Sequence, residues 1–179
     1  MKNIFPLLLM LSLLTSCVYH LGNPSLLAEM KRLSIAEILN QTQESSLTAL
    51  FKNALAERIG NEPGLCLASG NSSDDAAQLY LHIKTLDNHS LARAKLRDKK
   101  ETDYEGDAYQ TVLYRVSAKV AYEVYSASTP EKLLRKGEVS GQADLPKLHD
   151  REIALRAALR QLAIDLAANL VVDLSEKEP

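Results

Sequence analysis

The longest regular alternation of apolar and polar positions in the chain lies between residues 112 and 125. Apolar side chains occupy every second position, at Val112, Tyr114, Val116, Ala118, Val120, Tyr122 and Val124. A period of two places alternate side chains on one face of a strand. The pattern therefore predicts a half-buried strand of about 14 residues, well above the usual five or six.

Three shorter segments also have the character of strands. Residues 34–39 form one, and residues 78–85 alternate, with Leu79, Leu81 and Ile83 on one face and Gln78, Tyr80, His82 and Lys84 on the other. Residues 133–143 form a third, in which Gly137 and Gly141 are candidate bulge positions. A turn and a short apolar strand are expected at residues 61–69.

Two segments have the three- and four-residue spacing of amphipathic helices. The first has an apolar face of Leu47, Leu50, Phe51, Ala54, Leu55 and Ile59. We expect Ser45 or Ser46 to cap its start and Gly60 to end it with a positive φ. The second spans residues 153–174, with Asp150 as its cap and a stripe of Leu155, Leu159, Leu162, Leu166 and Leu170.

The order is strand, helix, three or four strands, helix. Elements with one apolar face each favour an α+β two-layer sandwich, with two helices packed on one face of a mixed sheet of about four strands. We expect a single domain over residues 34–174 and a polar tail at 175–179. The other sheet face is left for solvent or a partner.

The start of the chain has the features of a bacterial lipoprotein signal. An apolar run of 11 residues, Ile4–Leu14, is too short to span a bilayer and fits a signal peptide. Leu14-Thr15-Ser16-Cys17 has the form of a lipobox. We predict a signal peptide at residues 1–16, acylation of Cys17 and a lipidated tether at 17–33. The alternatives are an ordinary secreted protein cleaved nearby and an uncleaved amphipathic start. Val18 is compatible with sorting to the outer membrane.

Charge and cysteine content narrow the possibilities. The net charge is −2, with 21 basic and 23 acidic residues, so bulk nucleic-acid binding is not expected. With Cys17 acylated, Cys66 is alone. Its apolar neighbours predict a small buried side chain and no intramolecular disulfide.

The sequence contains no motif that requires catalysis. The four histidines have no metal-ligand spacing, and neither a nucleophile elbow nor a phosphate-binding glycine loop is present. We therefore predict a protein that is not an enzyme and holds no metal or cofactor. His82 is expected to face solvent.

One group of basic residues could form a binding site. Five lie within eight positions: Arg93, Lys95, Arg97, Lys99 and Lys100. In an extended segment alternate residues share a face, and such a row could bind phosphate groups. Lys132, Arg135 and Lys136 flank a neighbouring strand. The alternative is a solvated hairpin connection over residues 91–108, because acidic residues are interspersed.

Four segments together resemble the lipopolysaccharide-assembly lipoprotein family LptE. They are the residues Cys17 to Gly22, "LSIAEILNQTQESSLTALFKNALAERIG", "DDAAQLYLHIKTLDN" and "REIALRAALRQLAIDLAANLVVDL". The resemblance implies two helices on a mostly four-stranded sheet and no covalent chemistry. It further implies an outer-membrane lipoprotein, anchored on the periplasmic face, that plugs an LptD-like β-barrel and contacts lipopolysaccharide. The five basic residues would then meet lipopolysaccharide phosphates.

A second function of a different class remains open from the sequence. The chain could be a stand-alone envelope lipoprotein that binds lipid or serves as an accessory subunit of a lipid-transport system. An envelope hydrolase is a weaker third possibility, since no motif supports it.

Overall fold

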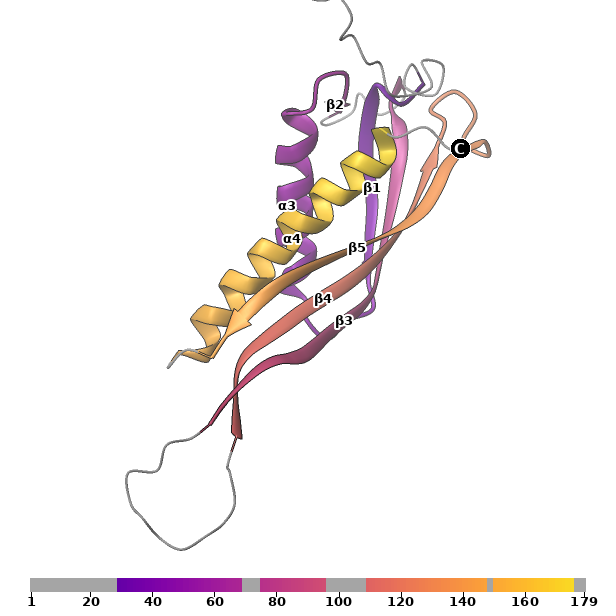
Figure 1. Ribbon diagram of the computed structural model, residues 1–179. Helices are drawn as coiled ribbons and strands as arrows, with labels where there is room; N and C mark the ends of the chain where they lie inside the picture. Colours follow the sequence, from indigo (N-terminus) through magenta and orange to yellow (C-terminus); the bar gives the residue numbers. More distant parts are fainter. Residues whose placement is uncertain (1–28, 69–74, 96–108, 148–149, 176–179) are drawn as a thin grey trace, which may run out of the picture.

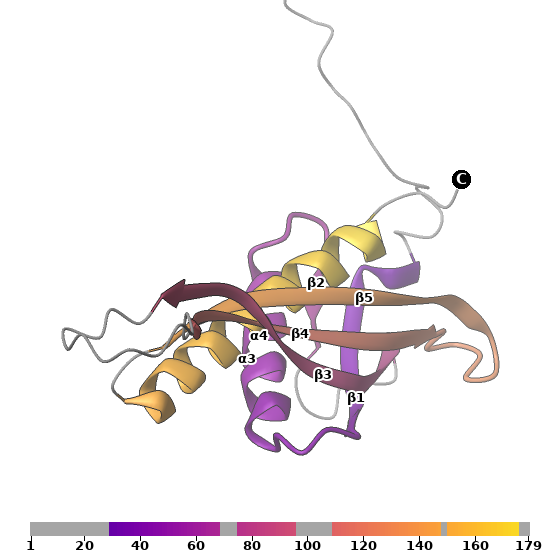
Figure 2. The same ribbon diagram turned by 60° about the horizontal axis from the view of Figure 1, so that its bottom comes forward.

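The computed structural model describes residues 29–68, 75–95, 109–147 and 150–175. The elements follow the order β1 (Arg32–Asn40), α3 (Ser46–Gly60), β2 (Cys66–Leu67), β3 (Ala77–Lys95), β4 (Tyr109–Tyr125), β5 (Leu133–Pro146) and α4 (Arg151–Ser175). Both helices cover the same face of one curved sheet (Figures 1 and 2). The predicted α+β two-layer sandwich is confirmed.

The sheet has five strands in the order β2-β1-β3-β4-β5. β1 runs parallel to β2 and β3, and the β3–β4 and β4–β5 pairs are antiparallel. The count exceeds the expected four because the apolar segment after α3 adds the two-residue strand β2 at one edge. β1 begins at Arg32, two residues earlier than predicted.

The β3–β4 pair extends well beyond the region that the apolar pattern identifies. β3 continues to Lys95, with Arg93 paired to Thr111, whereas the pattern predicts a strand that ends at residue 85. Side chains from 87 to 91 are exposed, so no apolar alternation marks this half. Backbone hydrogen bonds to β4 hold it instead, which is a stabilisation that hydropathy cannot reveal.

The core lies between the sheet and the two helices. α3 buries Leu47, Phe51, Leu55 and Ile59, and α4 buries its predicted leucines from 159 onward, while Leu155 is only partly buried. Leu79, Leu81 and Ile83 of β3 face the helices, as do Val116 to Val124 at alternate positions of β4. Both predicted apolar stripes are confirmed.

The Asp150 cap is confirmed, and α3 begins and ends where predicted, but the expected capping interactions of α3 are wrong. The Asp150 carboxylate accepts hydrogen bonds from the backbone N–H groups of Glu152 and Ile153, at 3.0 and 3.1 Å. Ser45 occupies the N-cap position of α3, but its side chain makes no cap hydrogen bond. Gly60 remains helical, and the positive φ (98°) lies at Gly64, in the turn that leads to β2.

A side-chain network orders the loop before α3 instead. Asn40 donates to the Glu44 carbonyl and to the Thr48 hydroxyl, both at 3.0 Å. Its carbonyl oxygen accepts from the backbone N–H and the hydroxyl of Thr42, at 2.9 and 2.8 Å. The loop is thus fixed from the last residue of β1.

Gly137 and Gly141 are not bulges, because the β4–β5 register runs unbroken past both. They allow close approach instead. A Cβ at Gly137 would lie 2.7 Å from the Tyr122 hydroxyl oxygen, and one at Gly141 would lie 2.7 Å from the Leu166 Cγ. The glycines therefore let a tyrosine ring and a helix lie directly on β5.

Cys66 is exposed, so the prediction of a buried side chain is wrong. It lies on β2, which is the edge strand of the described sheet and only two residues long. The adjacent Leu65 is buried. Apolar neighbours predicted burial for the whole segment, but alternation along the strand turns the cysteine outward.

Candidate functional site

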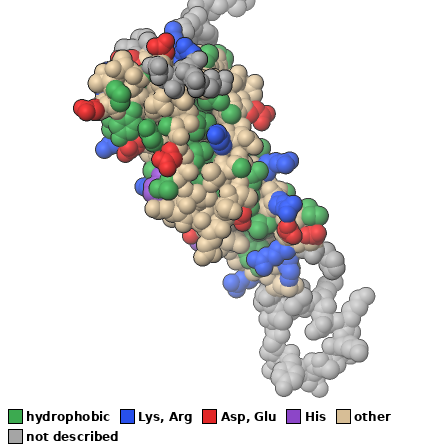
Figure 3. All heavy atoms as spheres, turned by 180° about the vertical axis from the view of Figure 1, so that it is seen from behind, with side chains coloured by type: hydrophobic (Ala, Val, Ile, Leu, Met, Phe, Trp, Pro, Cys, Tyr) green, Lys and Arg blue, Asp and Glu red, His purple; other side chains and the backbone are tan. Residues whose placement is uncertain are grey.

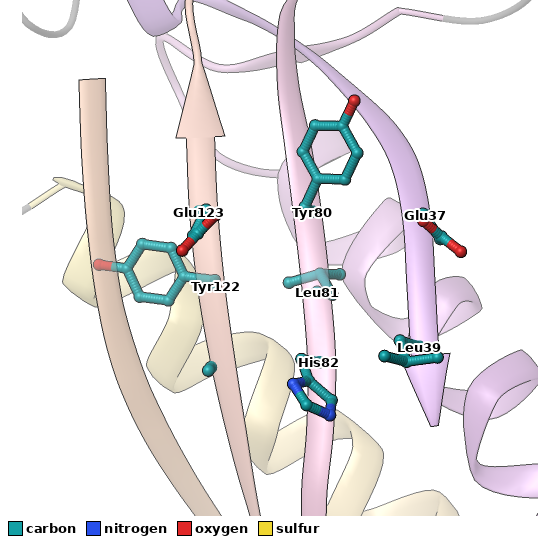
Figure 4. Close-up of a pocket in the computed structure, with 8 residues that line it drawn as sticks. Glu37, Leu39, Tyr80, Leu81, His82, Tyr122 and Glu123 are labelled. Atoms are coloured by element: carbon teal, nitrogen blue, oxygen red, sulfur yellow. The ribbon is translucent and has the colours of Figure 1, made fainter. Parts of the chain in front are cut away.

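The described residues form a hollow on the sheet face that the helices leave open. Its volume is about 270 Å³, and side chains from β1, β3 and β4 surround it. Figure 4 shows Tyr80 between Glu37 and Glu123, with His82 and Leu39 further along their strands. The lining residues are Glu37, Leu39, Tyr80, Leu81, His82, Ala121, Tyr122 and Glu123.

A bulge in β1 brings Glu37 and Leu39 to this face. Leu33 and Ile35 face the core. With strict alternation, residue 37 would also face the core. The β1–β3 register shifts between Ile35 and Glu37. The extra residue, Ala36, reverses the alternation, so Glu37 pairs beside Tyr80 and Leu39 beside His82.

Two tyrosines form an aromatic corner at one end of the hollow. The ring centroids of Tyr80 and Tyr125 are 5.7 Å apart, with the rings almost perpendicular at 89°. The Tyr125 hydroxyl donates to the Glu123 carboxylate at 2.8 Å, and this bond raises the pKa of Tyr125. Glu123 is thereby held beside the rings. A second hollow of about 300 Å³ adjoins the first and is lined by Tyr80, Glu123, Tyr125 and Pro130.

An ion pair crosses the sheet next to the hollow. Lys84 of β3 reaches Glu138 of β5 at 2.6 Å, over the intervening strand β4. The facing residue on β4 is Ala121, which pairs with His82 on one side and Glu138 on the other. Its small side chain leaves the path open. The Lys84 ammonium lowers the pKa of the Glu138 carboxyl.

His82 is more enclosed than the predicted solvent-facing side chain. The residue is partly buried, and its Nε2 atom is shielded from solvent with no hydrogen-bond partner among the described residues. Shielded polar atoms in proteins nearly always have a partner. His82 therefore lines the hollow with a ring nitrogen that is buried and has no partner among the described residues.

A separate polar cluster lies on the helix-covered face. The Tyr122 hydroxyl donates to Asp173 of α4 and accepts from the Arg135 Nε at 3.2 Å. Arg135 also lies 3.8 Å from Asp173. Burial, together with the hydrogen bond to Asp173, raises the pKa of Tyr122 to about 12. The sequence pattern groups Arg135 with exposed basic residues. In the structure Arg135 is buried and links β5 to α4 through Tyr122 and Asp173.

The basic row begins at the far end of the sheet. Arg93 is exposed near the end of β3, and Lys95 is the last residue of that strand. Arg97, Lys99 and Lys100 lie outside the described residues. Figure 3 shows basic side chains, mixed with acidic ones, at the end of the body near the grey segment.

The structure does not bring the second basic group, Lys132, Arg135 and Lys136, to this place. Arg93 pairs near one end of β4, at Thr111, whereas β5 begins opposite Tyr125 at the other end. Lys132 forms an ion pair with Glu29 at 3.0 Å. Arg93 and Lys95, the described part of the basic row, therefore lie at the opposite end of the sheet from this second group.

Among the residues that the structure describes, the hollow is lined by tyrosine, glutamate and histidine side chains together with small and apolar ones. No group of three or more His, Cys, Asp or Glu side chains in this part of the chain could hold a metal ion. No helix of the described residues is long and apolar enough to span a bilayer.

Sequence reasoning identified none of the hollow's residues as a site. Tyr80 with His82, and Glu123 with Tyr125, could have been paired by their spacing of two on the polar faces of their strands. Glu37 carried no such signal because the bulge at Ala36 changes its face.

Comparison with known proteins finds likeness only among solved structures. Rare lipoprotein B from Shewanella oneidensis matches with a TM-score of 0.46 and 15% identity, over 80% of this chain and 93% of that one. A minor lipoprotein from Acinetobacter baumannii matches at 0.43 and 14%, over 81% and 92%. The hypothetical protein CT253 from Chlamydia trachomatis matches at 0.49 and 10%, over 82% and 96%. No protein-family model and no curated protein matches the sequence. The likeness concerns the fold alone.

Proposed function

We propose that this chain is a lipid-anchored lipoprotein of the outer membrane that partners and plugs an LptD-type β-barrel in lipopolysaccharide assembly. Acyl chains on Cys17 would hold it at the periplasmic face. The observation that carries the proposal is the lipobox Leu14-Thr15-Ser16-Cys17, followed by the element order that resembles the LptE family. The role is one of binding, with no covalent chemistry.

The anchor follows from the chemistry of the lipobox cysteine. Each buried acyl CH₂ contributes roughly 0.8 kcal/mol, so several chains on one residue hold a protein at a membrane almost permanently. Eleven residues separate Cys17 from the first described residue, Glu29. At about 3.3 Å per extended residue they reach roughly 36 Å, so the domain could engage a barrel well above the lipid surface.

The open sheet face supports a binding role. The two helices cover the opposite face, so polar and aromatic side chains of β1, β3 and β4 are available to a partner. Leu39 and Tyr80 on this face are 50% and 42% exposed. Aromatic residues such as Tyr80 are enriched at protein interfaces relative to the rest of the surface.

Partner identity can be tested by crosslinking in whole envelopes. The tagged, lipidated protein would be crosslinked, purified and its partners identified by mass. We expect one outer-membrane β-barrel in near-equal amount, and a strong reduction for Cys17→Ser, which cannot be acylated. Recovery of an inner-membrane transporter instead would favour an accessory subunit of a lipid-transport system, and recovery of the lipoprotein alone would contradict the barrel partnership.

The proposed lipopolysaccharide contact places phosphates on Arg93, Lys95, Arg97, Lys99 and Lys100. Replacing Lys95, Arg97, Lys99 and Lys100 together by glutamine should weaken lipopolysaccharide binding and reduce its sensitivity to salt, because exposed charges are screened over about 8–10 Å. Affinity would be measured by titration of the labelled protein.

A matched control removes the same charge elsewhere. Lys31, Lys52, Lys119 and Arg160 are exposed and spread over the body of the domain. Their replacement by glutamine should leave the affinity nearly unchanged. Equal losses of affinity in the two variants would show that only the net charge of the protein affects binding. An unaltered affinity in the first variant would show that its four residues do not contact lipopolysaccharide.

A further inference from the structure

Two adjoining hollows on the open sheet face share Tyr80 and Glu123. Carboxylates of Glu37 and Glu123 line them, and neither is lined by a lysine or an arginine. From this arrangement we infer that the hollows bind the side chain of an arginine presented by a protein partner. This inference goes beyond the proposed function, since it holds for any protein partner.

The aromatic corner and the two carboxylates together favour a cation. An organic cation is attracted to the face of a tyrosine ring within about 6 Å of its centre. Glu37 and Glu123 pair beside Tyr80 from either side, so their strands place them roughly 10 Å apart across that ring. The bond from Tyr125 holds the Glu123 carboxylate in position before any ligand arrives.

Arginine fits this site better than lysine. The guanidinium is planar, stacks on aromatic rings and offers several donors to carboxylates in a fixed geometry, whereas an ammonium is a compact, strongly hydrated charge. Leu39 and Ala121 provide apolar surface for the aliphatic stem.

No lysine or arginine among the described residues lines the two hollows. Lys84 extends across β4 and forms an ion pair with Glu138 at 2.6 Å. Lys136 pairs opposite Glu123 on β5, but it lines neither hollow. The carboxylates of Glu37 and Glu123 beside Tyr80 are therefore available to a cation from a partner.

A protein that presents an arginine side chain is the kind of partner that suits the two hollows. The hollows are flanked by exposed Leu39 and Tyr80, which extend the contact beyond a single small ion. Arginine and tyrosine are both enriched among the few interface residues that contribute most of the binding energy.

The experiment uses the full lipidated protein in detergent micelles and Nα-acetyl-arginine amide as the probe. Ring signals of Tyr80, Tyr125 and His82 would be followed by NMR during the titration. We expect saturable shifts with the arginine probe and none with Nα-acetyl-citrulline amide, which has nearly the same shape without the charge. Equal shifts with citrulline would overturn the inference, as would larger shifts with phosphoethanolamine, which would point to a lipid headgroup.

Variants locate the site. The double variant Glu37→Gln with Glu123→Gln should lower the affinity for the arginine probe by at least about ten-fold, because hydrogen bonds to charged groups are stronger than those between neutral groups. The control Glu57→Gln with Glu152→Gln removes the same charge from the exposed surfaces of α3 and α4 and should change nothing. Thermal unfolding would confirm that all variants fold. Unchanged binding in the double variant would overturn the inference.

Discussion

The two faces of β3 differ sharply although their residues alternate along one strand. Leu79, Leu81 and Ile83 face the helices and are at most 2% exposed, whereas Tyr80 on the other face is 42% exposed. On the helix-covered face, apolar contacts and one buried polar cluster hold the layers together. On the open face, charged and aromatic side chains surround hollows and contribute little to the core. Substitutions on the first face should therefore change stability, and those on the second should change binding.

The largest effect is expected where α4 lies on Gly141. Leu166→Ala should lower the free energy of unfolding by about 2–5 kcal/mol because it leaves a cavity in the core. The control Ile164→Ala lies on the same helix with a side chain that is 47% exposed, and should change it by no more than about 0.5 kcal/mol. Chemical denaturation measures both. Equal losses would contradict the assignment of Leu166 to the core between α4 and the sheet.

A double variant sharpens this prediction. Gly141→Ala alone should cost about 1–3 kcal/mol, since its Cβ would meet Leu166 Cγ at 2.7 Å. With Leu166→Ala also present, that atom is absent, so the double variant should lose less than the sum of the two single losses. Simple additivity would show that the two residues do not contact each other.

The buried polar cluster should make stability depend on alkaline pH. Tyr122 in the unfolded chain ionises near pH 10, whereas in the folded protein its pKa is about 12. This contribution is complete below about pH 10 and is lost as the pH rises toward about 12, with an upper limit of about 2.7 kcal/mol. Tyr122→Phe should therefore reduce the fall in the free energy of unfolding over this range.

Tyr114→Phe is the matched control for that measurement, because Tyr114 lies on the same strand outside the polar cluster. It should keep the full fall with pH. If both variants followed the unsubstituted protein, Tyr122 would not be the group responsible.

The smallest effect is expected at the ion pair on the open face. Lys84→Gln should raise the pKa of Glu138 toward its ordinary value, because the ammonium that lowers it is gone. A titration of the Glu138 carboxyl signal by NMR measures this change. The melting temperature should scarcely move, since exposed ion pairs contribute little to stability. A large drop in melting temperature would mean that the open face also holds the fold together.

Much of the helix-covered face could be predicted from the sequence. Leu47 to Ile59 and the leucines of α4 have the spacing of one apolar face, and Asp150 is a helix cap. These features depend on local periodicity, which sequence records directly. The second half of the β3–β4 pair was missed because backbone pairing, not burial, holds it.

The candidate site could not be predicted in the same way. Its residues come from three strands, and Glu37 reaches it only through the bulge at Ala36. The close approach at Gly137 and Gly141 likewise depends on residues of β4 and α4 far away in sequence. Such features arise from the register between elements, which periodicity within one element does not contain.

We propose that a barrel partner docks on the open sheet face, where Tyr80 and Leu39 are exposed. A photo-crosslinking amino acid at position 80, on this face, can be compared in living cells with one at position 161, an exposed position of α4. We predict that position 80 crosslinks to an outer-membrane β-barrel, identified by mass, and that position 161 does not. Capture of the barrel from position 161 alone, or from neither position, would contradict the claim.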